Sequence, residues 1–150
     1  MPHRITIIHG HPDSSREHLC HALANAYRSG AEASDFEVRS ITVADLSFPL
    51  IRSGEDFVDG PRPTCIQEAQ SMIRSSDHLL LVYPLWLGTM PAMLKAFLEQ
   101  VFRYDLAFEP DARGHFDKKL TGRSARVMVT MGMPALAYRF YFGAHSLKSL

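Results

Sequence analysis

The sequence predicts an α/β protein in which a doubly wound parallel sheet lies between two layers of helices. Strand-like and helix-like segments alternate along the 150 residues, as they do where helices join parallel strands. The apolar run at residues 79–82 is short and is followed by Pro84, which is typical of a strand buried on both faces. Hydrophobic residues make up 46% of the chain and charged residues 21%, so we expect one globular domain over residues 1–150.

The first strand and helix are expected before residue 31. β-Branched residues at 4–9 indicate a strand. Ser14 and Glu17 have the spacing of a capping box that would begin a helix, and Gly30 would end it. The alternating residues 36–41 then indicate a second strand at an edge of the sheet.

The middle of the chain predicts a loop, a helix, a strand and another helix. Prolines and glycines at 44–63 indicate a loop. Thr64 and Gln67 have the spacing of a second capping box at the start of a helix. The third strand is expected at 78–83, and a helix that begins near a proline at 91–102.

The last third predicts one more strand. Residues 104–124 lack periodicity, as in a loop that is functional or disordered. Residues 125–131 indicate the fourth strand, and a helix is expected from 135 onward. A doubly wound domain normally closes with a fifth strand and helix, which we expect this chain to lack.

Charge and cysteine content exclude several functions. Sixteen basic and sixteen acidic side chains balance, which argues against a nucleic-acid partner. The two cysteines, Cys20 and Cys65, form no CxxC motif, and no signal peptide or membrane-spanning run is evident. A reducing cytoplasm is therefore the expected location.

The loop after the first strand has the character of an anion site. A helix N-terminus presents unpaired N–H groups to a phosphate, and Ser14, Ser15, Arg16 and His18 could add further donors. The alternative is an ordinary capped helix with solvated charges. The loop matches neither the phosphate-binding GxxxxGK[ST] motif nor the dinucleotide-binding GxGxxG motif.

The loop after the third strand carries the only tryptophan of the chain, Trp86. Pro84, Gly88 and Pro91 shape the turn around it. Ligands of open α/β sheets bind outside the carboxyl ends of the strands, so this loop suits a flat heterocycle such as flavin. The alternative is that Leu85 and Trp86 belong to the core.

The loop after the fourth strand begins with Thr130, Met131 and Gly132. Glycine allows a ligand to approach the backbone closely. Tyr138 and His145 lie two helical turns apart and could point the same way to share a proton. The alternative is a core tyrosine and a surface histidine.

Four further histidine positions, His9, His11, His18 and His21, allow a zinc site in principle. No cysteine or carboxylate completes a familiar ligand spacing, so we expect no metal.

With these residues in view, the chain resembles the flavodoxin-like NAD(P)H:quinone oxidoreductases, which include modulators of drug activity and ancillary flavoproteins of potassium-efflux systems. The resemblance covers nearly the whole chain and rests on His9–Pro12 with Ser15, Tyr83–Lys95, Gly114–Leu120, and Thr130–Pro134 with Tyr138 and His145.

The resemblance implies a sheet of order 2-1-3-4 and a role for each loop. The residues implied to hold the flavin phosphate are His11, Ser15, Arg16 and His18. Those implied to line the flavin ring are Pro84, Leu85, Trp86 and Leu87 on one side and Thr130, Met131 and Gly132 on the other. Tyr138 and His145 match the pair that stabilises charge as hydride reaches the ring.

The implied function is hydride transfer from NAD(P)H, through bound FAD or FMN, to a quinone or a similar acceptor. The family relatives are homodimers, so the same is expected here. Two alternatives stay open: a flavin-bearing regulatory subunit of a membrane transporter, and a truncated family member that binds no flavin.

Overall fold

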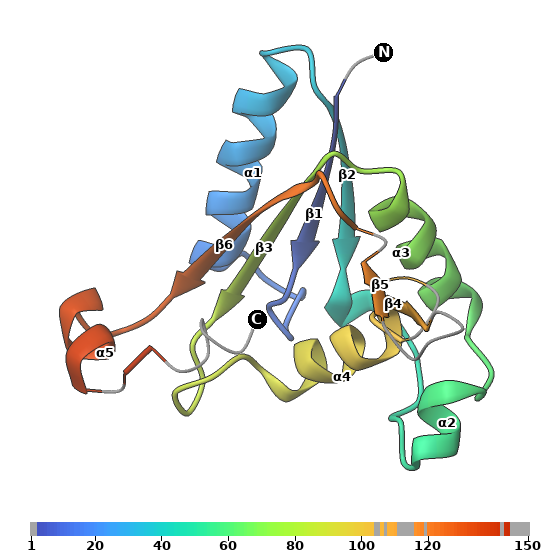
Figure 1. Ribbon diagram of the computed structural model, residues 1–150. Helices are drawn as coiled ribbons and strands as arrows, with labels where there is room; N and C mark the ends of the chain where they lie inside the picture. Colours follow the sequence, from blue (N-terminus) through green and yellow to red (C-terminus); the bar gives the residue numbers. More distant parts are fainter. Residues whose placement is uncertain are drawn as a thin grey trace.

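A four-stranded parallel sheet forms the centre of the computed structural model (Figure 1). The structure describes residues 3–103, 106, 108–110, 116–118, 120–141 and 143–144. The strand order is β2-β1-β3-β6, which confirms the predicted order 2-1-3-4. The strands are β1 (Arg4–His9), β2 (Glu37–Thr42), β3 (His78–Pro84) and β6 (Ser124–Thr130). Because all neighbours run parallel, their carboxyl ends meet at one end of the sheet.

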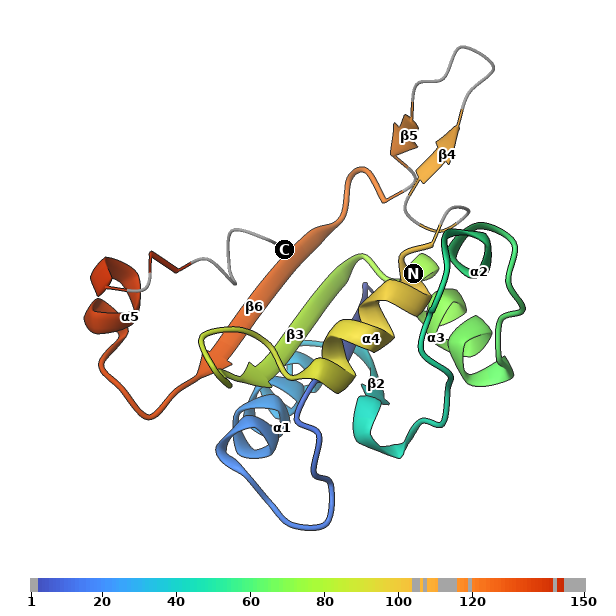
Figure 2. The ribbon, with the colours of Figure 1, turned by 90° about the horizontal axis from the view of Figure 1, so that it is seen from below.

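Helices cover both faces of the sheet, as predicted. Figure 2, seen from below, shows α1 on one face of the sheet, with α3 and α4 on the other. Strand side chains alternate between these layers: Ile7 and Val82 pack toward α1, whereas Ile8 and Tyr83 pack toward α3 and α4. The helices are α1 (Leu19–Glu32), α3 (Thr64–Arg74) and α4 (Ala92–Val101).

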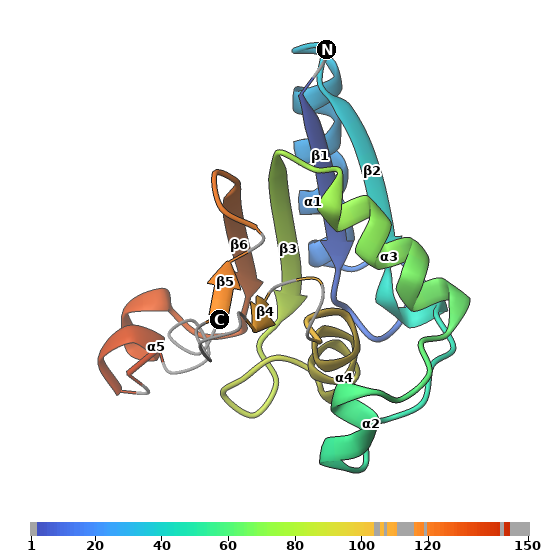
Figure 3. The same ribbon diagram turned by 45° about the vertical axis from the view of Figure 1, so that its right-hand side comes forward.

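The two regions predicted as loops contain short elements. The first holds a 3-10 helix, η1 (Val43–Asp45), and a short helix, α2 (Gly54–Val58). The second holds an antiparallel pair, β4 (Phe108–Pro110) and β5 (Phe116–Lys118). Helix α5 (Ala135–Tyr141) begins where predicted, and Figure 3 shows it beside the end of β6, apart from the two layers.

The predicted start of the first helix is wrong by about one turn. Helix α1 begins at Leu19, with His18 as its N-cap, and the side chains of His18 and His21 form the reciprocal capping contacts. The predicted capping pair does not form, because Ser14 donates instead to Asp45 Oδ1 at 2.6 Å.

Two other helix boundaries differ from prediction. Gly30 lies inside α1, which continues to Glu32, and the residue with left-handed backbone is Asp35, at φ +60°. Helix α3 has Pro63 as its N-cap, and Gln67 reaches past it to donate to the carbonyl of Arg62 at 2.8 Å.

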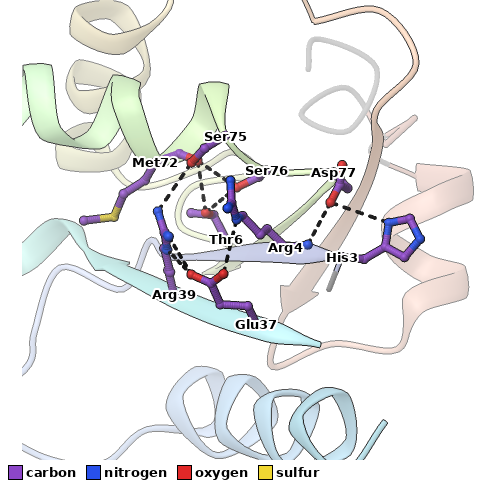
Figure 4. A network of polar contacts seen from close by, with 9 residues as sticks. All are labelled: His3, Arg4, Thr6, Glu37, Arg39, Met72, Ser75, Ser76 and Asp77. Atoms are coloured by element: carbon purple, nitrogen blue, oxygen red, sulfur yellow. Dashed lines mark hydrogen bonds and ion pairs between the residues drawn. The ribbon is translucent and has the colours of Figure 1, made fainter. Parts of the chain in front are cut away.

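A polar network joins β1, β2 and α3 at the amino ends of the strands (Figure 4). The hydroxyls of Thr6 and Ser76, both buried, lie 2.5 Å apart, and Ser76 donates to the carbonyl of Met72 at 2.7 Å. The Glu37 carboxylate accepts from Arg4 and from Arg39.

Among the described residues, no helix is long and apolar enough to cross a membrane.

Candidate functional site

Three loops at the carboxyl ends of β1, β3 and β6 touch one another. The backbone N–H of Leu85 donates to the carbonyl of Thr130 at 2.8 Å, which ties the second loop to the third. The imidazole of His11 meets the indole of Trp86 edge-on, with ring centroids 6.1 Å apart. The Thr130 hydroxyl lies 3.0 Å from Cys20 Sγ on α1. The three predicted loops therefore lie close together.

The second loop is a tight turn that holds its apolar side chains outward. Trp86 and Thr89 exchange both backbone hydrogen bonds, at 2.8 and 3.0 Å. Leu87 and Gly88 between them have positive φ values of 49° and 81°, the pattern of a type I′ turn. A leucine in this conformation costs about 1–2 kcal/mol.

The exposure of this turn excludes the interpretation of Trp86 as a core residue. The Trp86 residue is 49% exposed and Leu87 is fully exposed, in contrast to the buried Tyr83 of the preceding strand. The turn thus places a half-exposed indole at the mouth of the site, where a flat ring can pack against it.

Gly10 brings the first loop close to β3 and α4. Its backbone N–H donates to the carbonyl of Val82 at 2.8 Å. A Cβ atom at this position would lie 2.6 Å from Leu94 Cδ2 and 3.0 Å from Tyr83 Cβ. Only glycine fits here without movement of its neighbours, so the sequence Gly10-His11 fixes where the His11 ring stands.

Four histidine rings gather between β1 and the start of α1. The rings of His11 and His18 stack, with centroids 3.8 Å apart, and His21 lies 5.5 Å from His11. His9 lies 6.1 Å from His21 on the other side. The cluster comes from the short turn between β1 and α1, which folds His18 back over His11.

Burial lowers the pKa of two of these rings. His11 is 7% exposed, and burial, followed by the neighbouring His18, holds its pKa below the ordinary value. Burial, followed by His21 and Arg28, lowers the pKa of His9. Both rings therefore favour the neutral form, in which one ring nitrogen can accept a hydrogen bond. Consistent with this, the N–H of Asp13 donates to Nδ1 of His11 at 3.1 Å.

The carboxylate of Asp13 occupies the centre of the first loop. Its Oδ1 accepts from the backbone N–H and the hydroxyl of Ser15, at 2.9 and 2.6 Å. Its Oδ2 lies 2.9 Å from Nε2 of His18 and 3.6 Å from Nε of Arg16. The hydrogen bonds from Ser15, followed by that from His18, hold the pKa of this carboxyl far below its usual range.

The third loop leads to a pocket between β6 and α5. This pocket has a volume of about 630 Å³, and both Met131 and Tyr138 line it. Tyr138 is only 2% exposed. A Cβ atom on Gly132 would meet nothing within 4 Å, so there is open space beside that backbone.

The sequence analysis did not predict the part that the Asp13 carboxylate takes in this loop. Of the residues predicted to hold a phosphate, Ser15, Arg16 and His18 contact this carboxylate, and His11 contacts the Asp13 backbone. The signal was present, since an aspartate after proline commonly accepts from the backbone two residues on. His145, predicted to pair with Tyr138, lies outside the described residues.

A zinc site is not found in the part of the chain that the structure describes. There, no group of three or more histidine, cysteine or carboxylate side chains is arranged to hold a metal ion. The histidine rings stack and hydrogen-bond instead.

Comparison with known proteins places the chain in one family. The model of the family described as "flavodoxin-like fold" matches residues 3–149. An "uncharacterized NAD(P)H oxidoreductase" of Haemophilus influenzae is 28% identical over 136 residues, which are 89% of this chain and 66% of that protein. The glutathione-regulated potassium-efflux system ancillary protein KefG of Salmonella gallinarum is 26% identical over 93% of this chain and 64% of its own length. The chain thus spans slightly less than two thirds of the length of these relatives.

Solved structures show the same fold. The NAD(P)H:quinone oxidoreductase of Methanothermobacter marburgensis superposes with a TM-score of 0.80 at 19% identity, covering 100% of this chain and 77% of that one. An FMN-dependent NADH-azoreductase of Bacillus anthracis, solved with FMN, gives a TM-score of 0.71 at 20% identity, covering 98% and 78%.

Proposed function

Because the chain belongs to the flavodoxin-like fold family, we propose that it is a flavin-dependent NAD(P)H oxidoreductase that reduces a quinone or a similar acceptor. The observation that carries the proposal is the junction of three strand-end loops around the half-exposed Trp86. The Haemophilus relative is named an NAD(P)H oxidoreductase, and the Methanothermobacter protein is named an NAD(P)H:quinone oxidoreductase.

The residues at this junction fit a flavin. The indole of Trp86 and the exposed Leu87 offer an apolar surface for the ring, on the strand-end turn that also carries Pro84 and Leu85. The open space beside Gly132, after Thr130 and Met131, leaves room on the opposite side. In the proposal, the phosphate end lies toward the first loop, near His11, Ser15, Arg16 and His18.

The chain positions the reactants, and a bound flavin supplies the hydride chemistry. Tyr138 faces the same pocket as Met131, and in the proposal its hydroxyl, with His145, holds a proton where negative charge develops. The neutral His11 next to Trp86 orients the first loop without adding a positive charge of its own.

The cofactor is FAD or FMN. The Bacillus azoreductase was solved with FMN, which supports FMN without deciding against FAD. A homodimer, by analogy with the family, and a cytoplasmic location are part of the proposal. Exposed apolar side chains on α5, Leu136 and Phe140, offer a surface that a second copy could cover.

The test is visible absorption spectroscopy of the purified protein, incubated with flavin and freed of excess. We expect a bound flavin spectrum that bleaches when NAD(P)H is added without oxygen and returns when a quinone follows. Tyr138→Phe should bind flavin as the natural chain does. Its flavin should bleach at a rate at least about tenfold lower, since one proton-holding group is lost. Tyr141→Phe, on the same helix but 84% exposed, is the matched control. A protein that takes up no flavin contradicts the proposal.

A second function follows from the relationship to an ancillary protein of a potassium-efflux system. In that case the flavin site would report redox state to a membrane transporter. Co-purification with a transporter, together with slow turnover of free quinone, would favour this function.

A further inference from the structure

Four hydrogen-bond donors of the first loop point to one carboxylate. The Ser15 backbone N–H, the Ser15 hydroxyl, the His18 ring and the Arg16 guanidinium surround the Asp13 carboxylate at 2.6–3.6 Å. A backbone N–H, a hydroxyl, an imidazole and a guanidinium are also what a phosphate group binds. The Asp13 carboxylate therefore occupies the position in which these donors would otherwise bind a phosphate.

A phosphate cannot bind to these donors while they are bound to the Asp13 carboxylate. The donors within hydrogen-bond distance are already used, so each must leave Asp13 before it can serve another anion. A phosphomonoester carries about −1.5 to −2 charge near neutral pH, and it would meet a carboxylate that stays ionised. Like charges a few ångströms apart repel, so binding requires the Asp13 side chain to turn away.

From these contacts, and resting on the proposed function, we propose that Asp13 is a specificity-determining residue that acts as an internal anion in the flavin phosphate site and weakens binding of the phosphate of FMN. Flavin is then held mainly through its ring, at the Trp86 turn. The effect is greatest for FMN, whose terminal phosphate is doubly charged, and smaller for FAD, whose two bridging phosphates carry one charge each.

The test compares FMN with riboflavin, which has the same ring but no phosphate, by quenching of flavin fluorescence. For the natural chain we expect dissociation constants within about threefold of each other, because the phosphate gains little while the donors hold Asp13. Asp13→Asn keeps the side-chain shape and removes the charge. We expect it to tighten FMN binding about tenfold or more and to leave riboflavin unchanged.

The control is Asp45→Asn, which removes one negative charge from the same face. Asp45 accepts from Ser14 and touches none of the four donors, so we expect the ratio of FMN to riboflavin affinity to stay as in the natural chain. If FMN binds far more tightly than riboflavin to the natural chain, and Asp13→Asn adds nothing or weakens it, Asp13 does not oppose phosphate. A gain that Asp45→Asn reproduces would mean that net charge alone acts.

Inorganic phosphate gives a second readout that does not depend on flavin. Its binding can be followed by NMR at the Ser15 amide and the His18 ring. Asp13→Asn should bind phosphate more tightly than the natural chain; equal binding overturns the inference even if the protein is a flavoprotein. If phosphate binds better to the variant and no flavin binds at all, Asp13 opposes phosphate in this loop, but the proposed function and the claim about FMN both fail.

Discussion

The two ends of the sheet use polar side chains for different purposes. At the amino ends, Thr6, Ser76 and the Glu37 carboxylate are bound by neighbouring protein groups, and the network joins three elements (Figure 4). At the carboxyl ends, Ser15, Arg16 and His18 bind the carboxylate of Asp13. This cluster lies near a half-exposed Trp86 and a fully exposed Leu87. A polar cluster beside exposed apolar groups therefore indicates function, whereas a cluster that joins packed elements indicates a structural role.

The largest effect should come from the exposed indole. Trp86→Ala is expected to weaken flavin binding about 10- to 100-fold, the usual contribution of an aromatic side chain that stacks on a base. Thermal stability should fall less than for a core aromatic residue, since about half of Trp86 is already exposed in the free protein. Fluorescence titration measures the flavin affinity, and a melting curve measures the thermal stability. If Trp86→Ala binds flavin as tightly as the natural chain, the flavin ring does not bind at the carboxyl ends of the strands.

The next largest effect is expected at Gly10, which packs beneath the site against buried side chains. Gly10→Ala forces a methyl group against Leu94 and Tyr83 and should cost about 1–3 kcal/mol of unfolding free energy. Gly30→Ala is the matched control, because its Cβ would meet nothing within 4 Å and it lies inside a helix. There alanine should gain about 0.5–1 kcal/mol. Denaturant unfolding gives both values; equal signs would refute the close approach at Gly10.

A smaller effect is expected from the network at the amino ends. Ser76→Ala removes the hydroxyl between Thr6 and the Met72 carbonyl and should cost about 1 kcal/mol of stability. Flavin affinity should not change, because the substitution is at the opposite end of the sheet. A loss of affinity in this variant would show that the two ends are coupled.

The smallest effect is a dependence of stability on pH. Burial lowers the pKa of His9 in the folded protein from 6.5, so the unfolded chain binds a proton more readily. The stability from this neutral ring is fully present above the unfolded pKa of 6.5, and it is lost as pH falls below that value through the lowered pKa of the folded protein. His9→Gln should flatten the fall in unfolding free energy between about pH 7.5 and 5.5. Ser40→Ala, which removes only the hydroxyl next to the ring, should leave a titrating group and keep the slope.

The sequence predicted the sheet well because its signals are physical requirements of that sheet. The apolar run of β3 is buried on both faces, and the proline after it ends the strand at the site. The approximate positions of the Trp86 turn and of α4 followed from Pro84, Gly88 and Pro91. These residues restrict the backbone wherever they stand, so their effect could be predicted without tertiary contacts.

The details of the first loop could not be predicted, because they depend on competition between partners. Ser14 and Glu17 have the spacing of a capping box, but Ser14 finds Asp45, a residue 31 positions away. An imidazole pair, His18 and His21, caps the helix instead, and capping rules based on hydroxyls and carboxylates do not include it. The contacts of Ser15, Arg16 and His18 with Asp13 are local by contrast, between residues two to five positions apart.

Backbone amide NMR of the chain during a riboflavin titration observes both ends of the sheet at once, so it shows at which end flavin binds. We expect shifts at Leu85, Gly88 and Gly132 around the three loops, with the amides of Glu37 and Asp77 at the opposite end unmoved. Shifts concentrated at Glu37 and Asp77, or none anywhere at saturating riboflavin, would contradict it.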